Sequence, residues 1–167
     1  MILTNLIILK NNKPLALVCK RLSEVNSDFE ELVMLLNQEL AIINGDKNDF
    51  FIQFNNIDQL RHIVIAYQSG RAVGCGAMKV YGDNMMEIKR MYVRQPYRGK
   101  GVASTILSEL EKWAVELGTH RCILETHERM KDAIALYKKN QYAEIERYGQ
   151  YKDEPNSVCF EKCFNTR

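Results

Sequence analysis

The sequence predicts an α+β domain, in which a central, mostly antiparallel sheet of seven strands is flanked by about four helices. Three observations lead to this fold class. Three strand-like segments follow one another between residues 62 and 93, a strongly amphipathic helix comes next, and strands and helices then alternate. No repeat or Pro/Gly-rich linker divides the 167 residues, so we expect a single domain over 1–167, with 1–14 as an N-terminal extension.

The first predicted elements are a strand at 15–22, with the apolar run LALVCKRL, and a helix after it. Ser27 and Glu30 have the spacing of a capping box, so we expect Ser27 to cap the helix. Gly45 should end it, because glycine adopts the left-handed conformation at little cost. Residues 46–60 are rich in Phe and Asn without a clear period, which predicts a loop with a short helix.

The remaining elements are clearer, and two short turns, Ser69-Gly70 and Asp83-Asn84, separate the three consecutive strands. The strongest helix has one apolar face that includes Ile106, Leu110 and Trp113, and Gly118 should end it. The predicted segments are strands at 62–68, 72–82 and 85–93, a helix at 102–117, a strand at 122–126, a helix at 129–140, and strands at 142–149 and 157–164.

Composition narrows the possible partners. The net charge is only +2, which gives no general reason to expect nucleic-acid or anionic-membrane binding, and no stretch approaches about 18 apolar residues. The N-terminus lacks the basic leader and cleavage site of a signal peptide. Five cysteines without a CxxC pair and three histidines without ligand spacing favour buried, reduced thiols, no metal and a cytoplasmic protein.

The segment Arg98-Gly99-Lys100-Gly101-Val102-Ala103-Ser104 leads directly into the strongest helix and has the properties of an anion site. The start of a helix offers unpaired N–H donors and a partial positive charge, and glycine lets a phosphate approach the backbone. The segment fails the Walker A pattern, because Gly101 follows Lys100, and the dinucleotide pattern, because Ser104 replaces the third glycine. The alternative is that the glycines only make a tight turn.

These residues resemble a known pattern. Arg98 to Ala103 is similar to the R/Q-x-x-G-x-G/A signature of the GNAT superfamily of acyl-CoA-dependent N-acyltransferases. EIKRMYV at 87–93 resembles the fourth strand of that family, and LETHERMKDAIALYKKNQY at 124–142 resembles its fifth strand and the helix that follows. The resemblance implies a sheet that splays between strands four and five. The family often has glycine at the position of Gln141, so we expect Asn140 or Gln141 to take the helix-ending conformation, which asparagine tolerates better.

The resemblance also implies a site for acetyl-CoA, with no metal. Its pantetheine arm would pair with the main chain of Met91 and Val93, and the Met91 N–H would stabilise the oxyanion. The tyrosine of the A-x-x-L-Y segment, Tyr137, would be the general acid; the alternative is a core residue. The residues implied around the diphosphate are Arg98, Gly99, Lys100, Gly101, Val102, Ala103 and Ser104.

Glu87 is the candidate general base. Strict strand alternation would place it on one face with Lys89, Met91 and Val93, and the alternative is a surface carboxylate paired with Lys89 or Arg90. We expect Glu125, Thr126 and His127 to line the acceptor side, with His127 as an exposed turn residue. The variable segments 46–60 and 146–156, the latter with Tyr148 and Tyr151, should select the acceptor.

The sequence therefore predicts an enzyme that transfers an acetyl group from acetyl-CoA to a primary amine of a small molecule, such as an amino acid, a polyamine or an amino sugar. Two alternatives remain: acetylation of a protein or peptide amine, and a non-catalytic acyl-CoA sensor on the same fold. A homodimer is possible for each of them.

Overall fold

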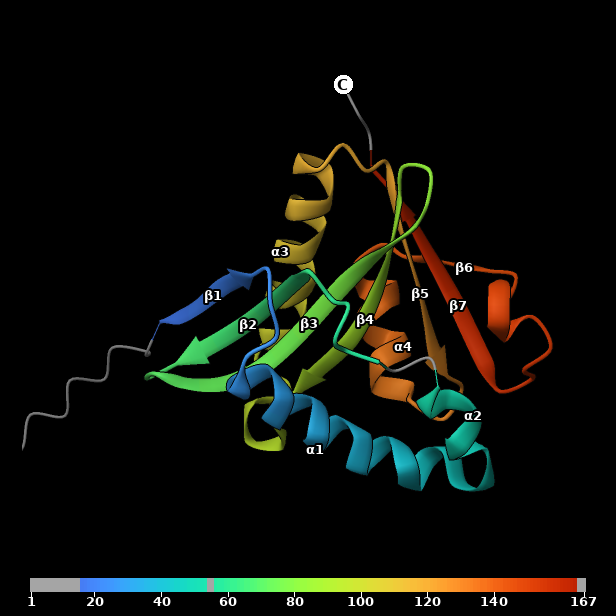
Figure 1. Cartoon of the computed structure of the whole chain (residues 1–167), viewed down its shortest axis with the longest axis horizontal. Coiled ribbons are helices and arrows are strands. Elements are labelled where there is room, and N and C mark those ends of the chain that lie inside the picture. The colour runs from blue at the N-terminus through green and yellow to red at the C-terminus, as the bar shows by residue number, and fades with distance from the viewer. Residues whose placement is uncertain (1–15, 54–55, 165–167) are drawn as a thin grey trace, which may run out of the picture.

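The computed structural model describes residues 16–53 and 56–164, which form one seven-stranded sheet with helices on both faces (Figure 1). The predicted extension at 1–14 lies outside the described residues. The elements are β1 Leu17–Leu22, α1 Ser27–Asn44, α2 Asn48–Ile52, β2 His62–Gln68, β3 Arg71–Gly82, β4 Met85–Val93, α3 Val102–Glu116, β5 Arg121–His127, α4 Lys131–Lys139, β6 Ala143–Ile145 and β7 Ser157–Cys163. The predicted fold class is confirmed.

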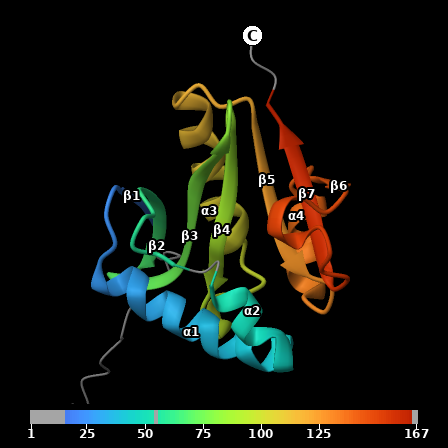
Figure 2. The ribbon, with the colours of Figure 1, turned by 45° about the vertical axis from the view of Figure 1, so that its right-hand side comes forward.

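The strand order is β1-β2-β3-β4-β5-β7-β6, and every neighbouring pair is antiparallel except β4 and β5. The parallel pairing of β4 with β5 covers three residue pairs, and the last pair is Glu87 with Ile123. Beyond it the two strands part, as Figure 2 shows. The predicted splay between strands four and five is therefore present, and it separates the sheet into two halves.

Two apolar clusters hold the helices against the sheet. On one face, α3 packs Ile106, Leu107 and Leu110 against β2, β3 and β4. On the other face, α1 buries Phe29 and Leu32 against the same strands. Each fully buried side chain of this size contributes about 1.5–3 kcal/mol, so both helices are fixed by apolar burial.

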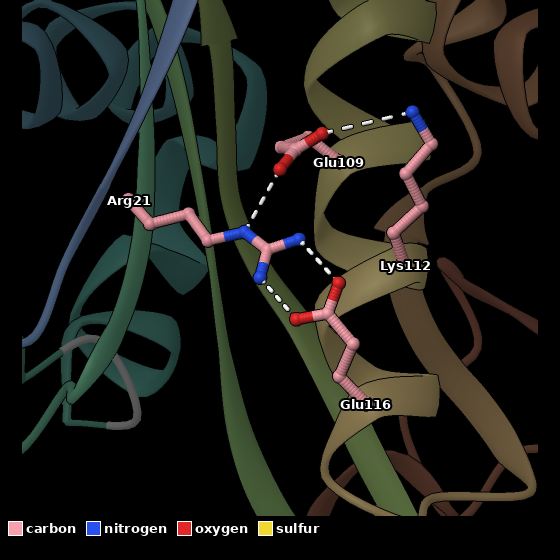
Figure 3. A network of polar contacts seen from close by, with 4 residues as sticks. All are labelled: Arg21, Glu109, Lys112 and Glu116. Carbon is pink, nitrogen blue, oxygen red and sulfur yellow. Dashed lines mark hydrogen bonds and ion pairs between the residues drawn. The ribbon is translucent and has the colours of Figure 1, made fainter.

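A polar network fixes α3 to the edge of the sheet (Figure 3). Arg21 on β1 donates to Glu109 over 2.8 Å and to both carboxylate oxygens of Glu116, and Lys112 lies 3.8 Å from Glu109. The Arg21 guanidinium also lies 5.2 Å from the centre of the Trp113 ring. These contacts link β1 to α3 in addition to the apolar packing.

Several helix ends differ from the prediction. The cap of α1 is Asn26 rather than Ser27: the Asn26 Oδ1 accepts the Phe29 N–H over 3.0 Å, and Ser27 is already helical. Asparagine is as good a cap as serine, and from one residue earlier it satisfies the N–H of Phe29 instead of that of Glu30. The predicted stops at Gly45 and Gly118 are confirmed, each with a positive φ. The helix predicted at 129–140 begins two residues later, because Met130 occupies its cap.

The strand predicted at 142–149 is much shorter, since β6 ends at Ile145 and the chain then turns through a short helix at Gly149–Tyr151. Cys75, Cys122 and Cys159 are buried free thiols, but the prediction is wrong for Cys163, which is exposed at the end of β7. No helix in residues 16–53 and 56–164 is long and apolar enough to cross a membrane. The same residues contain no group of three or more His, Cys, Asp or Glu side chains arranged for a metal.

Candidate functional site

The site begins where β4 leaves β5, and a bulge in β4 determines which side chains it receives. Gly76 of β3 lies opposite two residues of β4, because Ala77 pairs with Lys89 and Cys75 pairs with Tyr92. The bulged residue is Arg90, whose φ is 56°. An extra residue in one strand reverses the alternation beyond it.

The prediction that Glu87, Lys89, Met91 and Val93 share one face is therefore wrong. Glu87 and Lys89 lie on the face covered by α1 and α2, where they contact Tyr148 and Tyr151. Met91 and Val93 pack into the α3 cluster on the opposite face. The main chain of β4 beyond the bulge thus runs along the splay. Of the four side chains, the carboxylate of Glu87 lies on the α1 and α2 face of the sheet, and Met91 and Val93 lie on the α3 face.

The glycine segment, residues 98–104, follows β4 after a short helix at Gln95–Tyr97 and leads into the first turn of α3. Gly99 and Gly101 have φ values of 72° and 81°, and a Cβ at either position would meet no atom within 4 Å. Gly101 is the helix cap, and no side chain caps the first turn. The first N–H groups of a helix lack intrahelical acceptors. Their position beside open space is compatible with the predicted anion site, which stays a prediction.

The side chains of this segment are held by the protein itself. The Arg98 Nε donates to the Val93 carbonyl over 2.8 Å, and its Nη2 donates to both oxygens of Glu39 on α1. Lys100 donates to the Pro96 carbonyl over 2.9 Å. Val102 is buried in the α3 cluster, against which Ala103 packs. The backbone, rather than the arginine and lysine side chains, is therefore the part of the segment that is available to a ligand.

Tyr137 lies on α4 on the α3 side of the sheet, between the rings of Tyr142 and Phe160, each with its centroid 5.9 Å away. Burial, and secondarily the charge of Glu125, raises the pKa of Tyr137, so the phenol keeps its proton at neutral pH. Its position is thus compatible both with a core residue and with a proton donor.

The end of α4 is tied to α3. Asn140 donates to the Ser104 Oγ over 3.1 Å and to the Leu136 carbonyl over 2.8 Å. Gln141, rather than the more tolerant Asn140, takes the left-handed conformation, with a φ of 69°. The Asn140 side chain instead forms these two hydrogen bonds. Gln141, which stands where the family often has glycine, therefore adopts the left-handed conformation itself.

Glu87 is a buried carboxylate, not the surface residue of the alternative interpretation. It is 1% exposed, and its Oε1 accepts from the Tyr148 hydroxyl over 3.0 Å. Lys79 and Lys89 lie 3.5 and 3.6 Å from its Oε2, which forms no hydrogen bond. A carboxyl group that is buried and incompletely hydrogen-bonded at the splay is well placed for acid–base chemistry.

A second carboxyl group lies across the splay on β5. Burial raises the pKa of Glu125 to about 7, although a 2.5 Å hydrogen bond from the Ser157 Oγ and the nearby Lys89 favour the charged form. Thr126 and His127 follow it on the strand. His127 is buried rather than exposed, and its Nδ1 accepts the Arg129 N–H over 3.1 Å. Burial and the charge of Arg129 lower the pKa of His127.

Aromatic residues from the two variable segments cover this polar cluster. Tyr151 packs with Phe51 of α2 and Cys159 of β7, and the ring of Tyr148 lies 5.6 Å from that of Tyr151. The prediction that both segments border the acceptor side is consistent with this packing. A hollow of about 420 Å³ lies beside it and shares Ser157 and Cys159 with the cluster; the rest of its lining is Glu144, Ile145, Glu146, Arg147, Lys152 and Val158.

Sequence reasoning missed the parts played by Ser157 and Glu39. It did place Lys89 beside Glu87 on the same strand face, but as the partner of a surface carboxylate rather than of a buried one. Ser157 and Glu39 come from distant parts of the chain, and the spacing of the predicted elements gave no signal for either.

Comparisons with known proteins agree with this geometry. The model of the Acetyltransferase (GNAT) family matches residues 29–142. An IAA acetyltransferase from Azospirillum brasilense is 35% identical over 148 residues, which are 81% of this chain and 93% of that protein. An N-alpha-acetyltransferase MAK3 from Arabidopsis thaliana is 31% identical over 91 residues, 52% of this chain and 47% of that protein.

Solved structures show the same fold. A crystal structure from Klebsiella pneumoniae, assigned to the acyl-CoA N-acyltransferases, is 26% identical and covers 88% of this chain and 97% of that chain, with a TM-score of 0.73. A PaiA N-acetyltransferase from Thermoplasma acidophilum, solved in complex with coenzyme A, is 19% identical and covers 89% and 99%, with a TM-score of 0.67.

Proposed function

The chain belongs to the GNAT family of acetyltransferases, and we propose that it transfers the acetyl group of acetyl-CoA to a primary amine of a small molecule. The proposal rests on two structural features that lie next to each other along β4. The uncapped first turn of α3 begins at Val102, a short connection after β4 ends at Val93, and β4 parts from β5 after Glu87. A diphosphate at the turn would direct the attached thioester along the free side of β4 toward Glu87.

In this proposal the diphosphate is bound by backbone N–H groups in the segment from Gly99 to Ser104, and Arg98 and Lys100 add positive charge. The pantetheine arm pairs with the main chain of Met91 and Val93, and the Met91 N–H stabilises the oxyanion. Preorganised backbone donors of this kind contribute several kcal/mol to acyl transfer, because they need not reorient in the transition state.

Two side chains would move protons. Glu87 removes a proton from the ammonium group of the acceptor, directly or through a water molecule, so that the neutral amine can attack the thioester, and Tyr137 donates a proton to the departing thiolate. They lie on opposite faces of the sheet, so in this proposal the acceptor amine and the departing thiolate are served by separate groups. The closed surroundings of Glu87, capped by Tyr148 and beside Tyr151, favour a small acceptor over a peptide.

A coenzyme A release assay tests the proposal. Purified protein with acetyl-CoA is offered amino acids, polyamines, amino sugars and short peptides with free N-termini, and thiol is measured. We expect acceptor-dependent release with small amines and little with peptides. Release only with peptides would replace the proposed acceptor class, and acetyl-CoA binding without release under any acceptor would contradict the proposal itself.

A further inference from the structure

Glu87 and Lys89 are buried side chains of opposite charge, and each lacks hydrogen bonds that a substrate could supply. We propose that the acceptor is an α-amino acid, whose carboxylate binds the Lys89 ammonium while its amino group approaches the Glu87 Oε2. This inference rests on the proposed function and names the acceptor class of that same site. Lys89 is then the residue that determines specificity.

The evidence from Glu87 concerns one oxygen atom. The side chain is 1% exposed, Oε1 accepts the Tyr148 hydroxyl, and Oε2 has no hydrogen-bond donor. The two lysines near Oε2 are 3.5 and 3.6 Å away, whereas a charge-assisted N–H···O bond is about 2.8 Å long. A buried carboxylate oxygen without a donor is costly. An ammonium group of the acceptor would supply the missing donor.

Lys89 has the opposite deficit, because within the described part of the chain its ammonium group has N–H donors without acceptors. Its side chain is 9% exposed, and an ammonium group has three N–H donors. Among the described residues, the one hydrogen bond that it forms is with the Tyr151 hydroxyl, over 3.2 Å. Burial lowers the pKa of Lys89, and the charge of Glu87 opposes that change. A carboxylate of the acceptor would satisfy the remaining donors and restore the charge that burial disfavours.

The spacing of the two groups fits a zwitterion. The Lys89 Nζ and the Glu87 Oε2 are 3.6 Å apart. The amino nitrogen and the carboxylate oxygens of an α-amino acid are separated by the Cα and carbonyl carbons, which places them about 3 Å apart. An amino acid can therefore contact both groups at once, with each of its charges next to the opposite charge of the protein.

The charges around the pair favour an acceptor with an anionic group. Lys79 lies beside Glu87, and the charge of Arg90 acts on Lys89. The acidic groups that face them are Glu87 and Glu125, and Glu125 is only partly ionised near neutral pH. Positive charge is thus in excess. A diamine would add a further positive charge beside Lys89, whereas a zwitterionic amino acid adds no net charge.

The test compares amino acids with the amines that remain when their carboxylate is removed: methionine with 3-(methylthio)propylamine, phenylalanine with phenethylamine, and leucine with isoamylamine. For the wild-type protein with acetyl-CoA, we expect kcat/KM to be roughly 10- to 100-fold higher for the amino acid of the preferred pair, the range given by one charged hydrogen bond. Lys89→Met should remove that difference by raising KM for the amino acid alone, and Lys89→Arg should keep much of it.

Lys79→Met is the matched control. Lys79 lies as close to the same Glu87 oxygen, at 3.5 Å, but its side chain is 44% exposed, so its loss should leave the preference for the carboxylate in place. Binding of acetyl-CoA by each variant shows that it is folded. If Lys89→Met does not fold, the inference is tested by two other measurements: the preference of the wild-type protein for the amino acid over its amine, and the retention of that preference in Lys89→Arg.

Two results would overturn the inference: a wild-type protein that acetylates the amine as well as its amino acid, or a Lys89→Met variant that keeps the preference. In both cases amines are still acetylated, so the proposed function stands. Absence of thiol release with every acceptor, by a protein that binds acetyl-CoA, would instead remove the proposed function and the inference together.

Discussion

Glu39 of α1 accepts two hydrogen bonds of 2.8 Å from the guanidinium of Arg98, the first residue of the glycine segment. The same guanidinium donates from Nε to the Val93 carbonyl and lies 5.4 Å from the centre of the Tyr92 ring. The Tyr92 hydroxyl also donates to Glu39, over 3.3 Å. These contacts join α1, the end of β4 and the glycine segment, which gives the Arg98 side chain a role in holding this segment.

Substitution of Glu39 tests that role. We expect Glu39→Ala to weaken coenzyme A binding about two- to fivefold, because a partly exposed ion pair contributes up to about 1 kcal/mol and the turn loses its support. Isothermal titration calorimetry measures the change. Glu31→Ala is the control, since Glu31 also lies on α1 but holds Arg94. Tighter binding by Glu39→Ala would show that the released Arg98 side chain contacts the diphosphate itself.

Gly101→Ile should abolish coenzyme A binding while the fold persists. An isoleucine in the left-handed conformation costs about 1–2 kcal/mol, and its branched Cβ would occupy the approach of the phosphate. Wild-type protein with acetyl-CoA at about 100 Kd should gain roughly 2.7 kcal/mol, or about 5–10 °C in Tm. The variant should gain none.

Gly118→Ile provides the matched control for this substitution. Gly118 ends the same helix with a φ of 80° and has equal free space around its Cβ position. It should lose a similar amount of stability and still respond to acetyl-CoA. An equal ligand response from the two variants would contradict the assignment of the turn.

Tyr137→Phe should lower kcat about 100-fold or more with little change in KM, the range expected when a general acid is removed. Tyr142→Phe is the control, because Tyr142 is a buried tyrosine whose ring contacts that of Tyr137. Steady-state kinetics with the best acceptor of the release assay gives both constants. An unchanged kcat in Tyr137→Phe would make Tyr137 a core residue.

Glu125 should make stability depend on pH. Burial raises its pKa in the folded protein from the ordinary 4.5 to about 7, so the folded state holds this proton more tightly than the unfolded state. Its contribution, roughly 3 kcal/mol at most, is therefore complete below about pH 4.5 and is lost as the pH rises through 7.

Urea unfolding from pH 5 to pH 8 measures this effect. The free energy of unfolding should fall with rising pH more steeply in the wild-type protein than in Glu125→Gln, in which the group does not titrate. Ser157→Ala removes the hydrogen bond that favours the charged form, so it should extend the fall to higher pH. Parallel slopes for the wild-type protein and Glu125→Gln would contradict the raised pKa.

The order of the strands and helices was predictable because apolar periodicity and turn residues both indicate it. Ser69 and Gly70 make the predicted hairpin turn with positive φ at both positions, and Gly118 ends α3 as its conformational freedom suggests. The turn before α3 was predictable for the same reason, since two closely spaced glycines before a helix leave a local signal.

The sequence did not reveal which side chains of β4 lie on which face of the sheet. Alternation is reliable only in an unbroken strand, and the bulge occurs at Arg90, a residue type that gives no sign of a left-handed conformation. The burial of His127 and the contact of Glu39 with Arg98 depend on segments that are distant in sequence, so neither could be read from local pattern.

The central claim is that backbone donors between Gly99 and Ser104 hold the diphosphate of acetyl-CoA and so direct its thioester along β4. A crystal structure of the protein grown with coenzyme A tests it most directly. We expect diphosphate oxygens within hydrogen-bond distance of these N–H groups and the sulfur between β4 and β5. A cofactor bound elsewhere, with the first turn of α3 facing only water, would contradict the claim.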